Sequence, residues 1–256
     1  MGKIVLKTEL DLESMRPACA LAAKVLNEVA AFIKPGVTTR QIDNLAAEVI
    51  RAHGAKSAFL GYRKFPCHTC ISVNDEVVHG MGSERQVTFG DIVSLDVGVS
   101  YRGFIGDTAK TVAVGGCSVA AQRLMDVTEK ALYEGIAAAL PGNRVSDISR
   151  AVQQYVESNN FSVVREFVGH GVGRTMHEEP QIPNFVDRNS NQKLRSGMTL
   201  AIEPMVNAGS ANVKILKDGW TVVTQDGSLS AHFEHTVLIT DKGPEILTWP
   251  ENRSFA

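Results

Sequence analysis

Two aspartates occupy the two arms of a predicted β-hairpin. Apolar, β-branched runs flank a turn signal at 101–103, and Asp96 and Asp107 lie at nearly equal distances from it. Residues that face each other across an antiparallel pair have Cβ atoms about 4.5–5.5 Å apart. Two carboxylates that close in a half-buried sheet share a proton or bind a cation. The hairpin alone leaves two other interpretations open: a bulge turns one aspartate to solvent, or Asp107 caps a turn beside Gly106.

Three more residues of metal-ligand type lie in apolar strands or in a glycine loop, where packing does not call for a polar side chain. His170 lies between Gly169 and Gly171, and glycines let a backbone approach something closely. Glu203 follows an apolar strand, and Glu234 lies inside another. An ionised side chain in a buried strand costs roughly several kcal/mol unless it is paired or metal-bound. Four carboxylates and one imidazole predict a site for two divalent cations, made of Asp96, Asp107, His170, Glu203 and Glu234.

The donor set limits the metal and suggests hydrolysis. Oxygen-rich sites with one imidazole suit Mn, Fe, Co or Zn better than Cu(I). Two such ions lie ~3.5–4 Å apart in metallohydrolases and activate a shared water. His79 and His177 remain available for proton transfer or for contacts around the metals.

Other polar motifs receive structural interpretations. Cys67-His68-Thr69-Cys70 is a C-x-x-C, but it lacks a second cysteine pair and the βαβ context of a redox site. We expect no role for Cys67 and a pocket-lining role for Cys70. The histidines assigned to the surface or to structure are His53, His68, His232 and His235. His235 should point away from Glu234, to the opposite face of its strand.

The elements that must position these residues come in two similar sets. Helical periodicity predicts helices over 11–34, 39–53, 118–139 and 146–158, and apolar runs predict strands over 198–206 and 231–240. Residues 34–54 align with 140–160, so that Pro35-Gly36 falls on Pro141-Gly142. We therefore expect one catalytic domain over 1–256, with two halves, about 11–115 and 118–248, related by a pseudo-two-fold axis. A site at their junction would draw residues from both.

Composition excludes several classes of function. The 256 residues are 44% hydrophobic and 21% charged, with a net charge of −2, as in ordinary globular proteins. That charge gives no basic face for nucleic acid. No apolar run approaches the ~20 residues of a membrane helix, and no secretory signal is recognised. Four cysteines do not form a disulfide framework, so we expect a reduced, cytoplasmic protein.

Four motifs resemble those of the type I methionine aminopeptidases of peptidase family M24. They are DVGVSYRGFIGDTAKT, GHGVGRTMHEEP, TLAIEP and HFEHTVLIT, and the resemblance covers nearly the whole chain. It implies the α/β (α+β) pita-bread fold, with an antiparallel sheet inside and helices outside. It also implies two divalent ions that hold a water as hydroxide, with one ion bound by Asp96 and Asp107, the other by His170 and Glu203, and Asp107 and Glu234 as bridges.

The resemblance further implies the roles of the remaining site residues. Glu203 would be the general base, His79 would contact the substrate amide near the leaving group, and His177 would steady the scissile carbonyl oxygen. A metal would bind the free amino group of the substrate. The methionine pocket would be lined by Phe59, Tyr62, Phe65, Cys70, Met176 and Trp220. The chain departs from the usual family pattern at Arg63, Lys64, Phe65 and Met176, which affects the shape of the pocket and leaves the metal ligands unchanged.

The implied substrates are N-terminal peptides of nascent proteins whose second residue is small. The short, bacterial-type form suggests a monomer that contacts the ribosome transiently. Two rival functions share the fold. A proline-directed peptidase, such as a prolidase or aminopeptidase P, usually carries an additional N-terminal domain, and a non-catalytic binding homologue loses metal ligands that this chain retains.

Overall fold

Four long helices form in the order that the sequence predicts. The computed structural model describes residues 4–187 and 191–249, and its α-helices there are α1 (Glu9–Phe32), α2 (Thr39–Ala52), α3 (Val119–Ala138) and α4 (Val145–Ser158). The predicted start of the first helix at residue 11 is wrong, because Thr8 is the N-cap and Asp11 completes its capping box. In the described ranges, no helix is long and apolar enough to cross a membrane.

The strands form one large sheet and two small ones, and all their pairings are antiparallel. The large sheet has the order β1-β4-β5-β14-β9-β7-β8, with β2 beside β4 and β15 beside β14. Its strands are β1 (Lys56–Ser57), β2 (Cys70–Val73), β4 (Ile92–Tyr101), β5 (Phe104–Ala113), β7 (Gly169–Gly171), β8 (Glu178–Ile182), β9 (Thr199–Ile202), β14 (Glu234–Thr240) and β15 (Gly243–Ile246). The small sheets contain β3 (Glu76–Val78), β6 (Ser162–Val163), β10 (Met205–Asn207), β11 (Val213–Ile215), β12 (Val222–Thr224) and β13 (Ser230–His232).

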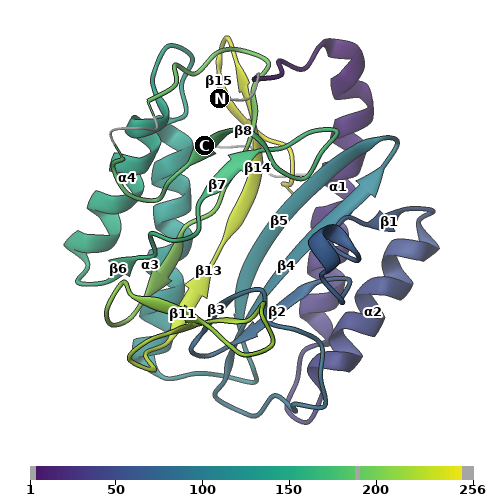
Figure 1. The fold of residues 1–256 in the computed structure, drawn as a ribbon, viewed down its shortest axis with the longest axis vertical. Coiled ribbons are helices and arrows are strands. Elements are labelled where there is room, and N and C mark those ends of the chain that lie inside the picture. The colour runs from purple at the N-terminus through teal and green to yellow at the C-terminus, as the bar shows by residue number, and fades with distance from the viewer. Residues whose placement is uncertain (1–3, 188–190, 250–256) are drawn as a thin grey trace.

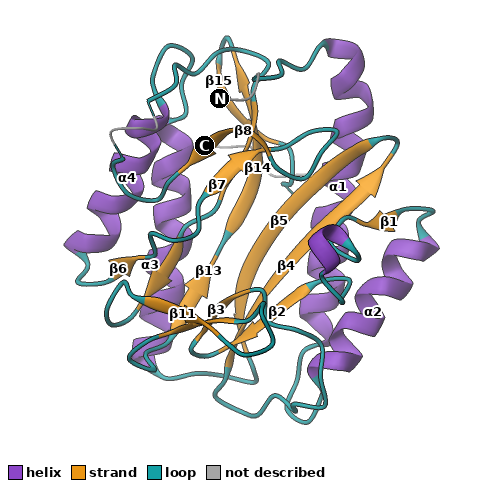
Figure 2. Cartoon of the chain, in the orientation of Figure 1, coloured by secondary structure: helices purple, strands orange, loops and turns teal. Residues whose placement is uncertain are grey.

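The helices flank the strands as two pairs. Figure 1 shows α1 and α2 at the right of the view and α3 and α4 at the left, and Figure 2 shows most of the strands between the two pairs in this view. One buried cluster joins α1 and α2 to β2 and β4, and a second joins α3 and α4 to β9 and β14. This arrangement confirms the expected fold, with an antiparallel sheet inside and helices outside.

Local hydrogen bonds confirm the internal repeat. The amide of Gly36 donates to Val87 O at 2.8 Å, and the amide of Gly142 donates to Leu194 O at 3.0 Å. Isolated β-bridges join Thr38 to Gln86 and Arg144 to Lys193, so α2 and α4 each begin beside a bridge of the same kind. Both glycines have a positive φ, 90° and 94°, which suits a residue without a side chain.

Two predicted strands are interrupted, and both interruptions lie at proposed metal ligands. The predicted strand 198–206 divides into β9 and β10 at Glu203-Pro204, because proline has no N–H to donate to a ladder. The predicted strand 231–240 divides into β13 and β14 at Phe233. The two segments still pair with each other on both sides of the breaks and in the same register: β9 pairs with β14, and β10 pairs with β13.

Candidate metal centre and substrate cavity

The central hairpin confirms the prediction in its elements but not in its register. Strands β4 and β5 connect through Arg102 and Gly103, both with positive φ, as in a type I′ turn. This turn pairs Asp96 with Ala109 and Asp107 with Gly98, so the expectation that the aspartates lie opposite each other is wrong. The two-residue offset keeps both carboxylates on one face, as diagonal neighbours.

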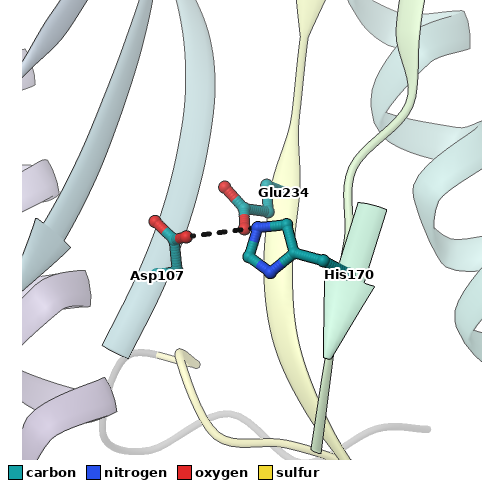
Figure 3. A group of neighbouring side chains, drawn as sticks. All are labelled: Asp107, His170 and Glu234. Atoms are coloured by element: carbon teal, nitrogen blue, oxygen red, sulfur yellow. Dashed lines mark ion pairs between the residues drawn. The ribbon is translucent and has the colours of Figure 1, made fainter. Parts of the chain in front are cut away.

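His170 is placed by glycines that allow neighbouring strands to come close. A Cβ on Gly169 would strike the carbonyl of Ala201, and one on Gly171 would strike the carbonyl of Glu179. The glycines therefore admit the backbones of β9 and the β8 segment, and His170 lies between those strands. Figure 3 shows its ring pointing toward Asp107 of β5 and Glu234 of β14.

The five predicted ligands line one cavity of about 340 Å³. Ligand atoms of Asp107, His170 and Glu234 all lie within 4.8 Å of one another. His170 Nε2 is 3.8 Å from Asp107 Oδ2 and 3.5 Å from Glu203 Oε1. The structure thus brings together residues from four strands and from both halves of the chain.

Unpartnered acceptors show that this donor set fits divalent cations. Among the described residues, Asp96 Oδ1, Asp107 Oδ1 and Glu234 Oε1 are buried without a hydrogen-bond partner. His170 Nδ1 lies 2.9 Å from the carbonyl of Gly171, which can only accept, so Nδ1 carries the proton. In the neutral ring, Nε2 then presents a lone pair to two carboxylates. Acceptors that face one another require a proton or a metal ion between them.

Electrostatics leads to the same requirement. Burial raises the pKa of all four carboxyl groups well above the ordinary range, and repulsion from neighbouring carboxylates raises it further. Burial, with His177 nearby, lowers the pKa of His170 to about 3, so its imidazole is neutral. Without cations, protons must neutralise this cluster. With cations, the carboxylates ionise and become ligands.

The two histidines predicted to contact substrate also line the cavity. His177 Nδ1 lies 2.7 Å from the hydroxyl of Tyr62, and its ring is 4.2 Å from the ring of His170 between centroids. His79 has a φ of 60°, an uncommon conformation for a non-glycine residue and one that clusters at functional sites. Burial lowers the pKa of His79 to about 4, so its ring is neutral at physiological pH.

Most of the predicted methionine pocket lines the same cavity. Phe59, Tyr62, Phe65, Cys70 and Met176 are all in its wall. Trp220 is not one of the wall residues, but its ring packs against Phe65 edge to face, with 5.1 Å between the ring centroids. Gly98 leaves room for this pocket, because a Cβ there would collide with the ring of Phe59 and with Met176 Cε.

His232, which the sequence assigned to the surface or to a structural role, does not lie at the surface. The side chain is buried, lines the cavity, and has Nε2 3.5 Å from Glu203 Oε2. Alternation along the strand gave a usable signal, because residues 232 and 234 share a face. Other wall residues that the sequence did not single out are Val78, Glu166, Phe167, Val168 and Met205, together with Arg63, which was noted only as a departure.

The remaining sequence interpretations have mixed placements. His53 is exposed, and Cys67 and Cys70 are buried free thiols. His68 is half-buried and its amide donates to Asp43 Oδ1. His235 lies on the face opposite Glu234, as predicted, and lines a different cavity.

Comparison with known proteins agrees with the cavity and the fold. Residues 13–241 match the model of metallopeptidase family M24. The chain is 51% identical over 245 residues to a methionine aminopeptidase of Clostridium perfringens, covering 96% of this chain and 98% of that one. The crystal structure of methionine aminopeptidase from Rickettsia prowazekii matches with a TM-score of 0.94 and 42% identity, covering 96% of this chain and all of that chain.

The rival proline-directed peptidases share only the fold. The prolidase of Pyrococcus furiosus matches with a TM-score of 0.78 but only 22% identity, and this chain covers 66% of it. The relatives at 51% and 49% identity, from Clostridium perfringens and Bacillus subtilis, are both methionine aminopeptidases. This chain therefore belongs to metallopeptidase family M24 and, within it, to the methionine aminopeptidases.

Proposed function

We propose that this enzyme removes the initiator methionine from peptides and nascent proteins whose second residue is small: Gly, Ala, Ser, Thr, Cys, Pro or Val. The observation that carries the proposal is the convergence of Asp96, Asp107, His170, Glu203 and Glu234 on one cavity, with buried carboxylate oxygens that lack partners. The neighbouring apolar wall suits a methionine side chain, because thioethers pack well against aromatic rings.

Two divalent ions, Co, Mn, Fe or Zn, would be held by these five side chains. Asp96 and Asp107 would bind one ion, His170 and Glu203 the other, and Asp107 and Glu234 would bridge them. Four negative charges then meet four positive ones, which makes the burial of all four carboxylates tolerable. When bound, the ions would lower the pKa of a coordinated water and polarise the scissile carbonyl.

The chain's own residues would move the protons and steady the developing charge. Glu203 would take the proton of the attacking water and give it to the departing amine. His177 would donate a hydrogen bond to the carbonyl oxygen through Nε2–H, which requires Nδ1 to be an acceptor. The hydroxyl of Tyr62, 2.7 Å from Nδ1, can donate there and fix that tautomer. His79, neutral and held in its strained conformation, would bind the amide of the second residue.

The setting of the reaction follows from the substrate. Nascent chains emerge in the cytoplasm, so we propose that the enzyme works there as a monomer with transient contact to the ribosome. Sedimentation with ribosomes that carry nascent chains would test the contact.

Metal reconstitution provides the decisive test. Metal-stripped protein should be inactive on a Met-Ala peptide and should recover activity when Mn, Fe, Co or Zn is added separately. Glu203→Ala and Asp107→Ala should stay inactive with every metal while keeping a folded circular dichroism spectrum. Release of Met from Met-Ala and Met-Gly peptides, with no cleavage of X-Pro dipeptides whose first residue is not methionine, is the expected specificity. Metal-independent release, or activity on X-Pro alone, would refute the proposal.

A further inference from the structure

The backbone of His232 is fixed by the central hairpin. Its amide donates to Thr111 Oγ1 at 2.9 Å, and Thr111 Oγ1 donates back to its carbonyl at 2.9 Å. Since the threonine hydroxyl has one proton, the hydroxyl of Ser94, 2.8 Å away, must donate to Thr111 Oγ1. Strand β13 also pairs His232 with Met205. The imidazole therefore projects from a backbone position with little freedom.

The ring approaches one particular oxygen of Glu203. His232 Nε2 is 3.5 Å from Oε2, whereas His170 Nε2 is 3.5 Å from Oε1. Each oxygen of the carboxylate thus faces its own imidazole. The proton of His170 is on Nδ1, so its Nε2 is an acceptor and is suited to a cation. His232 Nε2 is buried and has no hydrogen-bond partner in the described structure, and it can carry a proton.

We infer that His232 is a positioning residue that orients Glu203 by donating Nε2–H to Oε2. The inference rests on the proposed role of Glu203 as ligand and general base. The present separation exceeds that of a good N–H···O hydrogen bond by about half an ångström. Hydrogen bonds of this kind are often long in the unliganded enzyme and tighten when the site is loaded. A fixed donor on Oε2 would leave Oε1 directed toward the metal site.

Paired substitutions at this position separate orientation from packing. His232→Gln retains an N–H donor of similar reach, whereas His232→Leu fills the space without one. Losing a hydrogen-bond partner behind a metal ligand typically lowers activity or metal affinity about 10–100-fold. We expect His232→Leu to lose kcat by such a factor with little change in KM, and His232→Gln to recover most of it. Calorimetry should show a parallel loss of Mn affinity in His232→Leu.

His235→Gln is the matched control, since it alters a histidine three residues away that lines a different cavity. It should keep the kcat of the wild type. The inference is overturned if His232→Leu, folded as judged by its thermal midpoint, keeps wild-type kcat and Mn affinity, or if Gln and Leu lose both equally. If His232→Leu does not fold, His232→Gln and His232→Asn decide: the shorter amide should lose kcat and the longer one should not. A wild-type enzyme that is inactive with every metal would instead refute the proposed function.

Discussion

The sheet has a cavity on each of its two faces, and they differ in chemistry far more than in size. The metal cavity is about 340 Å³ and the cavity between α1 and α3 is about 370 Å³. Neighbouring residues of the same strand serve different cavities: Glu234 faces the first and His235 the second. In the second cavity two polar pairs are hydrogen-bonded, with His235 Nδ1 2.9 Å from Thr248 Oγ1 and Lys110 Nζ 2.7 Å from Asn27 Oδ1.

This difference separates structural polar groups from ligand-binding ones. Buried polar groups are normally hydrogen-bonded, so a satisfied set indicates packing. In the first cavity, three carboxylate oxygens of Asp96, Asp107 and Glu234 remain unpartnered. The distinction is open to test by changing matched residues on the two faces.

The largest expected effect comes from Glu234→Gln, compared with His235→Gln. Loss of a carboxylate that we propose bridges two metal ions should lower kcat/KM more than the roughly 10–100-fold that loss of an outer hydrogen-bond partner causes. His235→Gln should keep kcat/KM within about a factor of three, because its side chain faces away from the metals. Release of Met from a Met-Ala peptide measures both. Equal losses in the two variants would remove the functional distinction between the faces.

Glu234→Gln, which should lower activity, should raise the stability of the metal-free protein. The folded pKa of Glu234 is raised by burial and then by Asp107, Glu203 and Asp96, so stability is lost as pH rises above about 4.5, the value for an unperturbed glutamate. Glu234→Gln removes that loss. Its thermal midpoint at pH 7.5, without metal, should exceed that of the wild type, by roughly 2–4 °C for each kcal/mol recovered. Added Mn should raise the midpoint of the wild type far more than that of the variant. A metal-free variant that melts below the wild type would contradict this account of the cluster.

Low pH should destabilise the fold through His235 in the second cavity. Burial lowers the pKa of His235 from 6.5 to about 4, so the unfolded chain takes up a proton in this interval while the folded chain does not. Stability from this group is therefore complete above pH 6.5 and is lost as pH falls toward 4. This contribution is at most on the order of 3 kcal/mol, and solvent screening of the half-buried ring reduces it.

His235→Gln should flatten the decline in urea-unfolding free energy between pH 6.5 and 4. His53→Gln, at an exposed position, is the control and should keep the slope of the wild type. An unchanged slope in His235→Gln would mean that this ring does not resist protonation.

The sequence predicted the fold and the convergence of the five candidate ligand residues on one cavity, because both leave local signals. Pro35-Gly36 and Pro141-Gly142 indicated the repeat, and the structure gives both glycines the same hydrogen bond. Carboxylates in apolar strands indicated the candidate ligands, although the sequence gives no distances between them. The diagonal offset of Asp96 and Asp107 was missed because the register depends on which residues form the turn.

Where strands break, local patterns were insufficient. Residues 198–206 and 231–240 have the composition of continuous strands, yet Pro204 and Phe233 divide them, although the two segments pair in one register on both sides of the breaks. The sequence assigned His232 to the surface or to a structural role. Its contact with Glu203 depends on a tertiary pairing, β10 with β13, that no sequence period encodes.

Two glycines of the hairpin allow the two faces of the sheet to be compared through backbone positions. A Cβ at Gly98 would meet side chains of the metal cavity, Phe59 and Met176, whereas one at Gly106 would meet the backbone of Ala18 and Cys19 in α1. Flexible side chains can move, but a helix backbone cannot without loss of packing. Gly98→Ala should therefore raise KM for a Met-Ala peptide about tenfold with a modest fall in thermal midpoint. Gly106→Ala should mainly lower the midpoint. The reverse pattern would show that the methionine pocket is elsewhere.

The smallest effect is expected at the mouth of the metal cavity, where Arg63 and Lys64 depart from the usual family pattern. Arg63 lines the cavity and its guanidinium lies 5.4 Å from the centroid of the Tyr62 ring. The pKa of His177 is lowered by burial and, to a lesser degree, by the charge of Arg63. Removing that charge in Arg63→Ala should raise the pKa of His177 toward 6.5. Because the neutral ring is the form held by Tyr62, the acidic limb of the kcat/KM profile should move to higher pH, with less than about a threefold change at pH 8.

Lys64→Ala, which removes the neighbouring charge, should leave that limb in place. Identical pH profiles of kcat/KM for the two variants would mean that burial, and not the charge of Arg63, lowers the pKa of His177.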